Sequence, residues 1–320
     1  MKNRKLSPGT SLSSVSSRTP GEGYKYFWRN RYLYLLLLPA VIYYIVFKYI
    51  PMYGVTIAFK DFNFAKGILG SDWIGLENFK YLFGLDNFYK VFFNSIYLSF
   101  IRLLWGFPIP IILALMLNEM RSLHYKKILQ TVVYLPHFIS WVVLGGIIIS
   151  FLSPSWGVVN YLIKALGGEP VFFMAKADYF RKIIVISDIW KGAGWGTIIY
   201  LAAITGISPE LYEAAIVDGA GKLQRLWYIT LPCIRTTIVL CLILRMGSIM
   251  SNGFEQIFIL QNTQNLDVSE VFETWTYRLG LLNGRFSFAT TVGLFTSLVS
   301  LFFLLAADRL AKKLGEEGIF

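Results

Sequence analysis

The sequence has few charged residues and few of the side chains that bind metals. Only 15% of its 320 residues are Asp, Glu, Lys or Arg, whereas soluble domains carry about a quarter. The two cysteines, Cys233 and Cys241, stand about 12 Å apart along a helix, which excludes a disulfide between them. The only histidines, His124 and His137, lack the spacing of a zinc-binding pair. The sequence therefore predicts no metal site and no cofactor.

Apolar residues are abundant instead. Hydrophobic residues make up 55% of the chain and aromatic residues 17%, which indicates a protein whose solvent is largely lipid. A bilayer core needs about 20 apolar residues per helix. The sequence predicts an all-α, polytopic membrane protein with six transmembrane helices, at about 32–58, 91–117, 128–152, 183–203, 231–250 and 286–307.

The segments outside these spans give the domain organisation and the orientation. Residues 1–31, rich in Ser, Gly and Pro and without a signal-peptide core, are expected to form a flexible cytoplasmic tail. The transmembrane domain is expected at 32–310, followed by a second cytoplasmic tail at 311–320. With both termini inside, 15 Lys and Arg lie on the cytoplasmic side and 10 outside. The expected location is the cytoplasmic membrane of a bacterium. The net charge of +11 is explained by these loops and not by nucleic acid. The long external stretches, 59–90 and 253–285, are expected to be structured.

The loop at 207–232 is unlike a minimal connection between two spans. Ser208 can cap a helix that begins at Pro209, and Gly219 suits its end. This short helix is acidic and rich in Ala, which favours docking on a partner protein. An amphipathic helix lying on the membrane surface is the alternative. The candidate docking residues are Leu211, Glu213, Ala214, Ala215, Asp218 and Gly219.

The same loop carries a family resemblance. Glu213-Ala214-Ala215, then Gly219 after three intervening residues, and Ile229-x-Leu231-Pro232 resemble the EAA signature of ABC importer permeases. Weaker motifs in the same order, such as Asp188-Ile189-Trp190-Lys191, resemble carbohydrate-type permeases, and among these the branch that handles polysaccharide-derived oligosaccharides. The resemblance implies the type I importer fold and alternating access. It also implies four kinds of partner: a second, related but different permease, two cytosolic ATP-binding subunits, an external solute-binding protein and an oligosaccharide.

Polar and aromatic residues inside the fourth and fifth predicted spans, or just after the fifth, are candidates for the substrate path. Ionisable groups in a membrane face a cavity or a partner, and sugar rings stack on aromatic faces. The candidates are Trp190, Lys191, Trp195, Arg245 and Asn252. Lys191 has two interpretations, an i,i+3 ion pair with Asp188 or a lining of the path. Together with Arg102, the two cations Lys191 and Arg245 would suit an anionic, uronate-containing oligosaccharide.

Other functional classes fit less well. Gly219-Ala220-Gly221-Lys222 lacks the flanking residues of a phosphate-binding loop. A polytopic enzyme, for example a glycosyl transferase, needs clustered carboxylates or a metal. An ion-coupled transporter needs midplane acids, and Asp188 is the only one so placed. The sequence therefore predicts a permease without enzymatic activity.

Overall fold

The computed structural model describes Tyr26, 28–316 and 318–319, and the chain divides into two compact units at Gly54–Val55. The described part of the first unit is helical. It contains α2 (Arg31–Tyr44), the π-helix η1 (Ile45–Tyr49) and α3 (Ile50–Met52), and none of their residues is buried. Nearly all of the predicted tail, 1–31, lies outside the described residues.

The 3-10 helix η2 (Tyr53–Phe59) spans the division between the units, and the second unit continues with a small folded region before the next long helix. Two short strands, β1 (Lys60–Asp61) and β2 (Asp72–Trp73), pair antiparallel, with Lys60 opposite Trp73. The intervening α4 (Gly67–Gly70) and the following α5 (Glu77–Phe83) complete it. The amide of Asn78 donates to the carbonyls of Ala58 and Lys60, which fixes α5 against this hairpin. The prediction that 59–90 is structured is therefore confirmed.

The remaining long helices carry the predicted spans. The second stretch forms α6 (Asp86–Gly106) and α7 (Pro108–Asn118). The break between them lies at Pro108, which has no N–H to donate within the helix. The fourth forms α11 (Ala177–Thr205) and the sixth forms α19 (Phe286–Lys313). Since α19 runs to Lys313, the C-terminal segment begins later than the predicted 311.

The third predicted span is not one continuous helix. It forms α8 (Leu123–Tyr134), the 3-10 helix η3 (Leu135–Phe138) and α9 (Trp141–Phe151), and the two halves are bent by 97°. Pro136 tightens the end of the first half, and Ile139 is extended. Ser140 then caps α9 by accepting from the N–H of Val143. After α9 comes α10 (Val158–Ala165).

The fifth predicted span is bent as well. The predicted stretch 231–250 contains α14 (Leu231–Cys233) and α15 (Arg235–Gly247), and it is preceded by α13 (Lys222–Arg225) and the π-helix η4 (Leu226–Thr230). The helix from Lys222 to Cys233 is bent by 58° relative to α15. The segment between α15 and α19 holds α16 (Phe254–Leu260), α17 (Leu266–Ser269), α18 (Phe272–Thr276) and the π-helix η5 (Tyr277–Leu282). The prediction that 253–285 is structured is confirmed.

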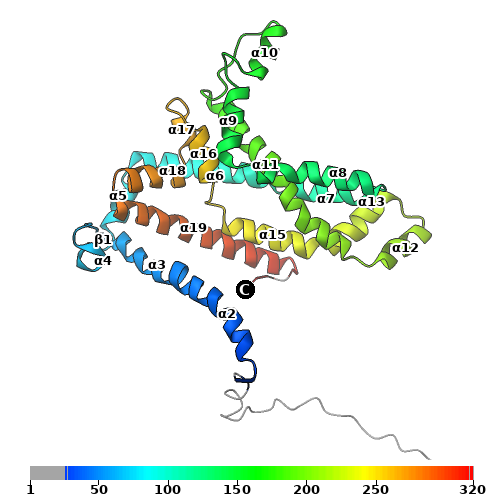
Figure 1. The fold of residues 1–320 in the computed structure, drawn as a ribbon, viewed down its shortest axis with the longest axis horizontal. Coiled ribbons are helices and arrows are strands. Elements are labelled where there is room, and N and C mark those ends of the chain that lie inside the picture. The colour runs from blue at the N-terminus through cyan, green and yellow to red at the C-terminus, as the bar shows by residue number, and fades with distance from the viewer. Residues whose placement is uncertain (1–25, 27, 317, 320) are drawn as a thin grey trace, which may run out of the picture. The chain divides into compact units, whose positions relative to one another are not determined.

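Helix packing in the second unit centres on α11. This helix packs along α7 and α6, and α15 packs along α19 (Figure 1). Gly194 lets α11 approach the neighbouring backbone closely, because a Cβ there would collide with the carbonyl oxygen of Val133. Three apolar clusters hold the bundle together, one around Phe272 and Phe288, one around Phe180 and Leu260, and one around Tyr200 and Ile234.

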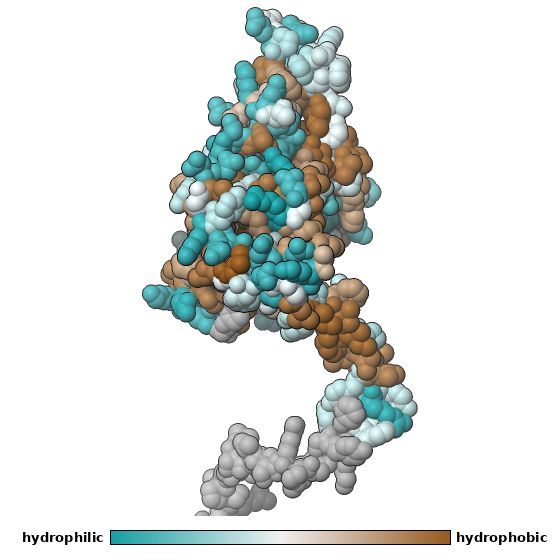
Figure 2. Space-filling model, turned by 90° about the vertical axis from the view of Figure 1, so that its left-hand side faces the viewer, coloured by the Kyte–Doolittle hydropathy of each residue, from teal (hydrophilic) through white to brown (hydrophobic). Residues whose placement is uncertain are grey.

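The exposed surface is that of a membrane protein. Large apolar side chains are exposed on α6, α8, α9 and α19, and brown apolar patches cover much of the face in Figure 2. Among the described residues, three helices are long and apolar enough to cross a membrane, or five if each bent pair is a single crossing. α11 has 29 residues but is more polar, because it carries Asp188 and Lys191. It contains the fourth predicted span, 183–203.

Candidate functional site

The first candidate site is α12 (Pro209–Val217), the helix of the loop between α11 and α15. Gly219 has φ +80°, a left-handed conformation that glycine adopts without strain. The N–H of Ala220 donates to the carbonyl of Ala215 at 2.8 Å, and the N–H of Gly219 to that of Ile216 at 3.0 Å. These two bonds form a Schellman motif, which satisfies carbonyls that the helix end would otherwise leave unpaired. The predicted helix end at Gly219 is thus present.

The start of α12 differs from the expectation. Ser208 stands at the N-cap position, but its side chain makes no capping hydrogen bond. The loop is instead tied to the bundle by Tyr212, whose hydroxyl lies 3.0 Å from that of the buried Thr230. This contact joins α12 to η4, the π-helix that leads into the fifth span.

Most of the surface of α12 is exposed, apart from the half-buried Tyr212 and Ala215. No residue of the helix is buried. Of the predicted docking residues, Leu211, Glu213, Ala214 and Asp218 are exposed and Ala215 is half-buried. Larger apolar side chains stand beside them, with Ile216 55% and Val217 86% exposed. A helix that exposes apolar and acidic side chains side by side, and is tied to the bundle through Tyr212, is a candidate for docking on another protein.

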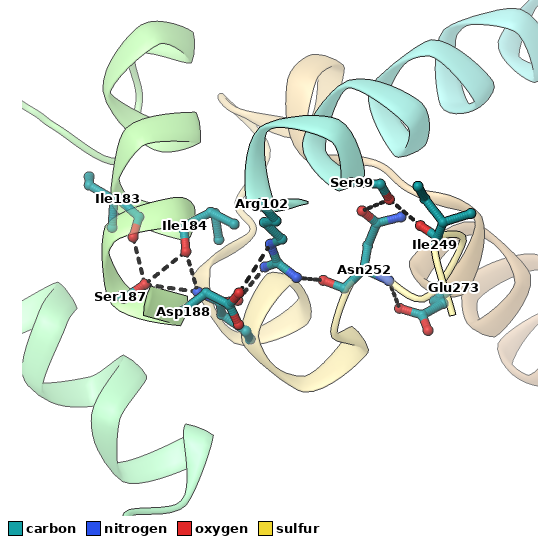
Figure 3. A network of polar contacts seen from close by, with 10 residues as sticks. Ser99, Arg102, Ile183, Ile184, Ser187, Asp188, Ile249, Asn252 and Glu273 are labelled. Carbon is teal, nitrogen blue, oxygen red and sulfur yellow. Dashed lines mark hydrogen bonds and ion pairs between the residues drawn. The ribbon is translucent and has the colours of Figure 1, made fainter. Parts of the chain in front are cut away.

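The second candidate site is a polar network inside the bundle, centred on Arg102 of α6 (Figure 3). Its side chain is 4% exposed, and it donates to the carbonyl of Asn252 and to the side-chain oxygen of Gln256. Asp188 of α11 faces it, with 4.0 Å between the arginine Nε and a carboxylate oxygen. Arg102 therefore links α6 to α11, to the helix that carries Gln256 and to the loop at Asn252. Its burial corrects the expectation that it faces substrate.

Asn252 belongs to the same network. It is completely buried, and its side-chain oxygen accepts from the hydroxyl of Ser99 at 3.0 Å. Its backbone N–H donates to a carboxylate oxygen of Glu273 at 3.2 Å, and Ser251 donates to the other at 3.0 Å. Asn252 thus offers no surface to a sugar in this conformation. Burial raises the pKa of Glu273 above its ordinary value of 4.5, and the two hydrogen bonds act in the opposite direction.

Lys191 does not form the predicted i,i+3 pair with Asp188. Its ammonium group donates to the carbonyl of His137 at 2.6 Å and lies 5.6 Å from the ring centroid of Trp141. The reason is the bend after η3, because carbonyls at a helix end have no partner within the helix. The acid that was expected to neutralise Lys191 faces Arg102 instead.

Two open pockets adjoin these residues. The Lys191 pocket, of about 410 Å³, lies at the bend between η3 and α9. Its lining includes His137, Trp141, Asp188 and Glu255 besides Lys191 itself. It combines an ammonium group, two carboxylates and an aromatic ring.

The Arg245 pocket, of about 430 Å³, lies between α7, α11 and α15 and shares Asp188 with the Lys191 pocket. Arg245 is exposed in this chain, so its charge is available at the pocket wall. Of the two predicted tryptophans, Trp195 stacks on the ring of His137 with 4.5 Å between centroids, beside the Lys191 pocket. Trp190 is 52% exposed and lines neither pocket.

The structure thus brings together Lys191, Arg245 and Trp195, and it adds residues that the sequence did not single out. Gln256 and Glu273 come from α16 and α18, and Trp141 from the start of α9. Gln256 lies 154 residues from Arg102 in the chain and Glu273 lies further still, and no linear motif connects them. Ser140 before Trp141 is a helix-start signal that could have shown the break.

Comparison with known proteins agrees with this architecture. The family model described as "Binding-protein-dependent transport system inner membrane component" matches residues 81–316. The chain is 46% identical over 292 residues to Protein LplB of Bacillus subtilis (strain 168), covering 91% of this chain and 92% of that protein. It is 47% identical over 292 residues to the polygalacturonan/rhamnogalacturonan transport system permease protein YteP of the same organism, covering 91% of each.

A solved structure is similar over nearly the same length. It is the crystal structure of a bacterial alginate ABC transporter in complex with alginate pentasaccharide-bound periplasmic protein. The match has a TM-score of 0.85 and 42% sequence identity, and it covers 92% of this chain and 99% of the other. The predicted resemblance and the predicted permease fold are both confirmed.

Proposed function

Because the chain belongs to the family of binding-protein-dependent transport system inner membrane components, we propose that it imports an oligosaccharide across the bacterial cytoplasmic membrane by alternating access. Members of this family are transport components and not enzymes, so the alternative of a membrane glycosyl transferase is rejected. The similarity to a permease for polygalacturonan and rhamnogalacturonan, and to a transporter of alginate, supports an anionic sugar as substrate.

The energy for transport enters through α12. The exposed face of this helix, with Glu213 and Asp218 beside Val217, would insert into a cytosolic ATP-binding subunit. Acidic groups there can accept charge-assisted hydrogen bonds from Arg of the partner. Tyr212 then passes the movement to Thr230 and the fifth span. A docked α12 places this loop, and with it both termini, on the cytoplasmic side.

The other partners follow from the same family. A second, related permease would complete the pathway, and a solute-binding protein would deliver the sugar from outside. Alternating access requires the substrate and ATP to bind the inward-facing and outward-facing states with different affinities.

The polar pockets are the observation that carries the substrate assignment. Sugar rings stack on aromatic faces while their hydroxyls form hydrogen bonds, and Trp141 and Trp195 stand beside charged groups. Lys191 and Arg245 share the pockets with the carboxylates of Asp188 and Glu255, and Asp188 also faces Arg102. With Arg102 counted, three cations stand against two carboxylates. This surplus of positive charge suits a uronate carboxylate.

The experiment is reconstitution of the chain with the second permease, the ATP-binding subunits and the binding protein in proteoliposomes. Uronate oligosaccharides should stimulate ATP hydrolysis and accumulate inside. Lys191→Met and Arg245→Met should each lower uptake of a uronate oligosaccharide, and Trp190→Phe, outside both pockets, should not. Unchanged uptake in both methionine variants would reject the anionic substrate. If no sugar stimulated the complex, oligosaccharide import itself would be wrong.

A further inference from the structure

A third open pocket lies between α15, α18 and α19, with a volume of about 640 Å³. This is within the range of about 300–1,000 Å³ that is usual for small-molecule sites. Ser248 lines both this pocket and the Arg245 pocket, so the two are adjacent. We call it the hydroxyl pocket, after the lining side chains Ser248, Ser251, Thr276, Thr296, Ser297 and Ser300.

Its lining differs in charge from the neighbouring pockets. Among the described residues, no Lys, Arg or His lines it, and Glu273 is its one ionisable group. The Arg245 pocket and the Lys191 pocket each present a cation. An anion would therefore find a counter-ion in those two pockets and none in the hydroxyl pocket.

The direction of the hydrogen bonds strengthens this contrast. Ser248 donates its proton to the carbonyl of Arg245 at 3.1 Å, and Thr296 and Ser297 donate theirs to the carbonyl of Gly293 at 3.0 and 2.8 Å. Ser251 donates to Glu273. With the protons engaged inside the protein, these hydroxyls retain acceptor lone pairs for a ligand. Acceptors suit the O–H groups of a neutral sugar, whereas a carboxylate is itself only an acceptor.

We propose that the hydroxyl pocket is a second sugar subsite that takes an uncharged sugar unit, next to the cation-lined pockets that take a uronate unit. This rests on the proposed function and deepens it. The preferred substrate is then a mixed oligosaccharide in which neutral and acidic units are joined, and a purely acidic chain of the same length fits less well.

The test uses the complete transporter in proteoliposomes and three oligosaccharides of equal length, one purely uronate, one purely neutral and one mixed. Uptake by the unaltered protein should show the lowest KM for the mixed compound. Ser297→Leu fills the pocket from α19, and it should raise the KM for the mixed compound about tenfold, the equivalent of one or two lost hydrogen bonds. The KM for the purely uronate compound should change less than twofold.

Two further variants separate a sugar contact from a packing defect. Leu298→Phe adds bulk on the same turn of α19 outside the pocket, and it should leave both KM values unchanged. Thr296→Val combined with Ser297→Ala removes two acceptors without added bulk. This double variant should also raise the KM for the mixed compound, as Ser297→Leu does.

Three results would overturn the subsite. One is equal KM values for mixed and purely uronate compounds in the unaltered protein. Another is an equal rise in the KM of the mixed and the purely uronate compound in Ser297→Leu. The third is loss of the second permease from the purified complex in Ser297→Leu but not in Leu298→Phe, which would assign this surface to a subunit contact. In each case uptake of the uronate compound by the unaltered protein would leave the proposed function standing.

Discussion

The left-handed conformation of Gly219 allows a sharp test of how α12 acts. Replacing it by Ala should weaken coupling without disturbing the transmembrane bundle, because a Cβ at Gly219 meets nothing within 4 Å. The cost is therefore conformational, about 1–2 kcal/mol for an L-residue in this region. That cost lowers the population of the closed Schellman turn about 5- to 30-fold relative to the open one. Docking on the ATP-binding subunit should weaken by up to the same factor.

Gly221 provides the matched control two residues away. Its φ is −69°, which any residue adopts, and a Cβ there would meet the Gln224 side chain at an ordinary 3.6 Å. Gly221→Ala should therefore retain substrate-stimulated ATP hydrolysis. Asn tolerates the left-handed region, so Gly219→Asn should lie between the wild type and Gly219→Ala, and the β-branched Gly219→Val should be the most impaired.

The assay is the rate of substrate-stimulated ATP hydrolysis by the reconstituted complex as a function of the concentration of ATP-binding subunit. The reasoning predicts a weaker apparent affinity in the order Gly, Asn, Ala, Val, with thermal unfolding of the bundle unchanged. Equal behaviour of Gly219→Ala and Gly221→Ala would refute it, because the two substitutions differ only in backbone conformation.

Three further predictions concern stability and coupling. Asn160 is 1% exposed, donates to the carbonyls of Leu152, Ser153 and Val171, and accepts from the N–H of Val171. Asn160→Ala should therefore lower the free energy of unfolding by about 1–3 kcal/mol, which a lower thermal unfolding temperature in detergent would show. Burial raises the pKa of Glu270 above its ordinary value of 4.5 despite the nearby Arg278, so the folded protein retains this proton at a pH where the unfolded chain has lost it. The free energy of unfolding should therefore fall as pH rises above 4.5, and its slope against pH should be shallower in Glu270→Gln. Arg235 pairs with Glu316 at 2.6 Å and donates to the carbonyl of Leu314 at 3.0 Å, which joins the segment after α19 to the start of α15. Because Arg235 is 54% exposed, Arg235→Gln should lower the free energy of unfolding by less than about 1 kcal/mol. It should nevertheless reduce stimulated ATP hydrolysis more than Arg309→Gln does.

The features that could be predicted from the sequence depend on local patterns. The apolar stretches gave the long helices to within a few residues at most ends, since α6–α7 contains the predicted 91–117 and α19 the predicted 286–307. The end of α12 was also predictable, because Gly219 follows an otherwise helical segment. The spacing of Leu211, Ala214 and Asp218 on one side of a helix predicts a docking face, and this stays a prediction.

The features that could not be predicted depend on contacts between distant parts of the chain. Arg102 and Asn252 are 150 residues apart, so the burial of both could not be inferred from either neighbourhood. Lys191 has an acid one turn away and still pairs with the carbonyl of His137, because the bend after η3 exposes that carbonyl. Pro136 and Ser140 mark that bend, but a stretch of 25 residues without Asp, Glu, Lys or Arg concealed it.

The most direct test of the account is a cross-link from α12. Val217 is 86% exposed at the end of the helix, and Cys233 and Cys241 can be replaced by Ser to leave Val217→Cys as the only cysteine. A photoactivatable group on this cysteine, in the reconstituted complex, is predicted to cross-link to the ATP-binding subunit, with an efficiency that changes when ATP is bound. Cross-linking to lipid alone, with no ATP-dependent change, would contradict the claim that this helix receives the force for transport.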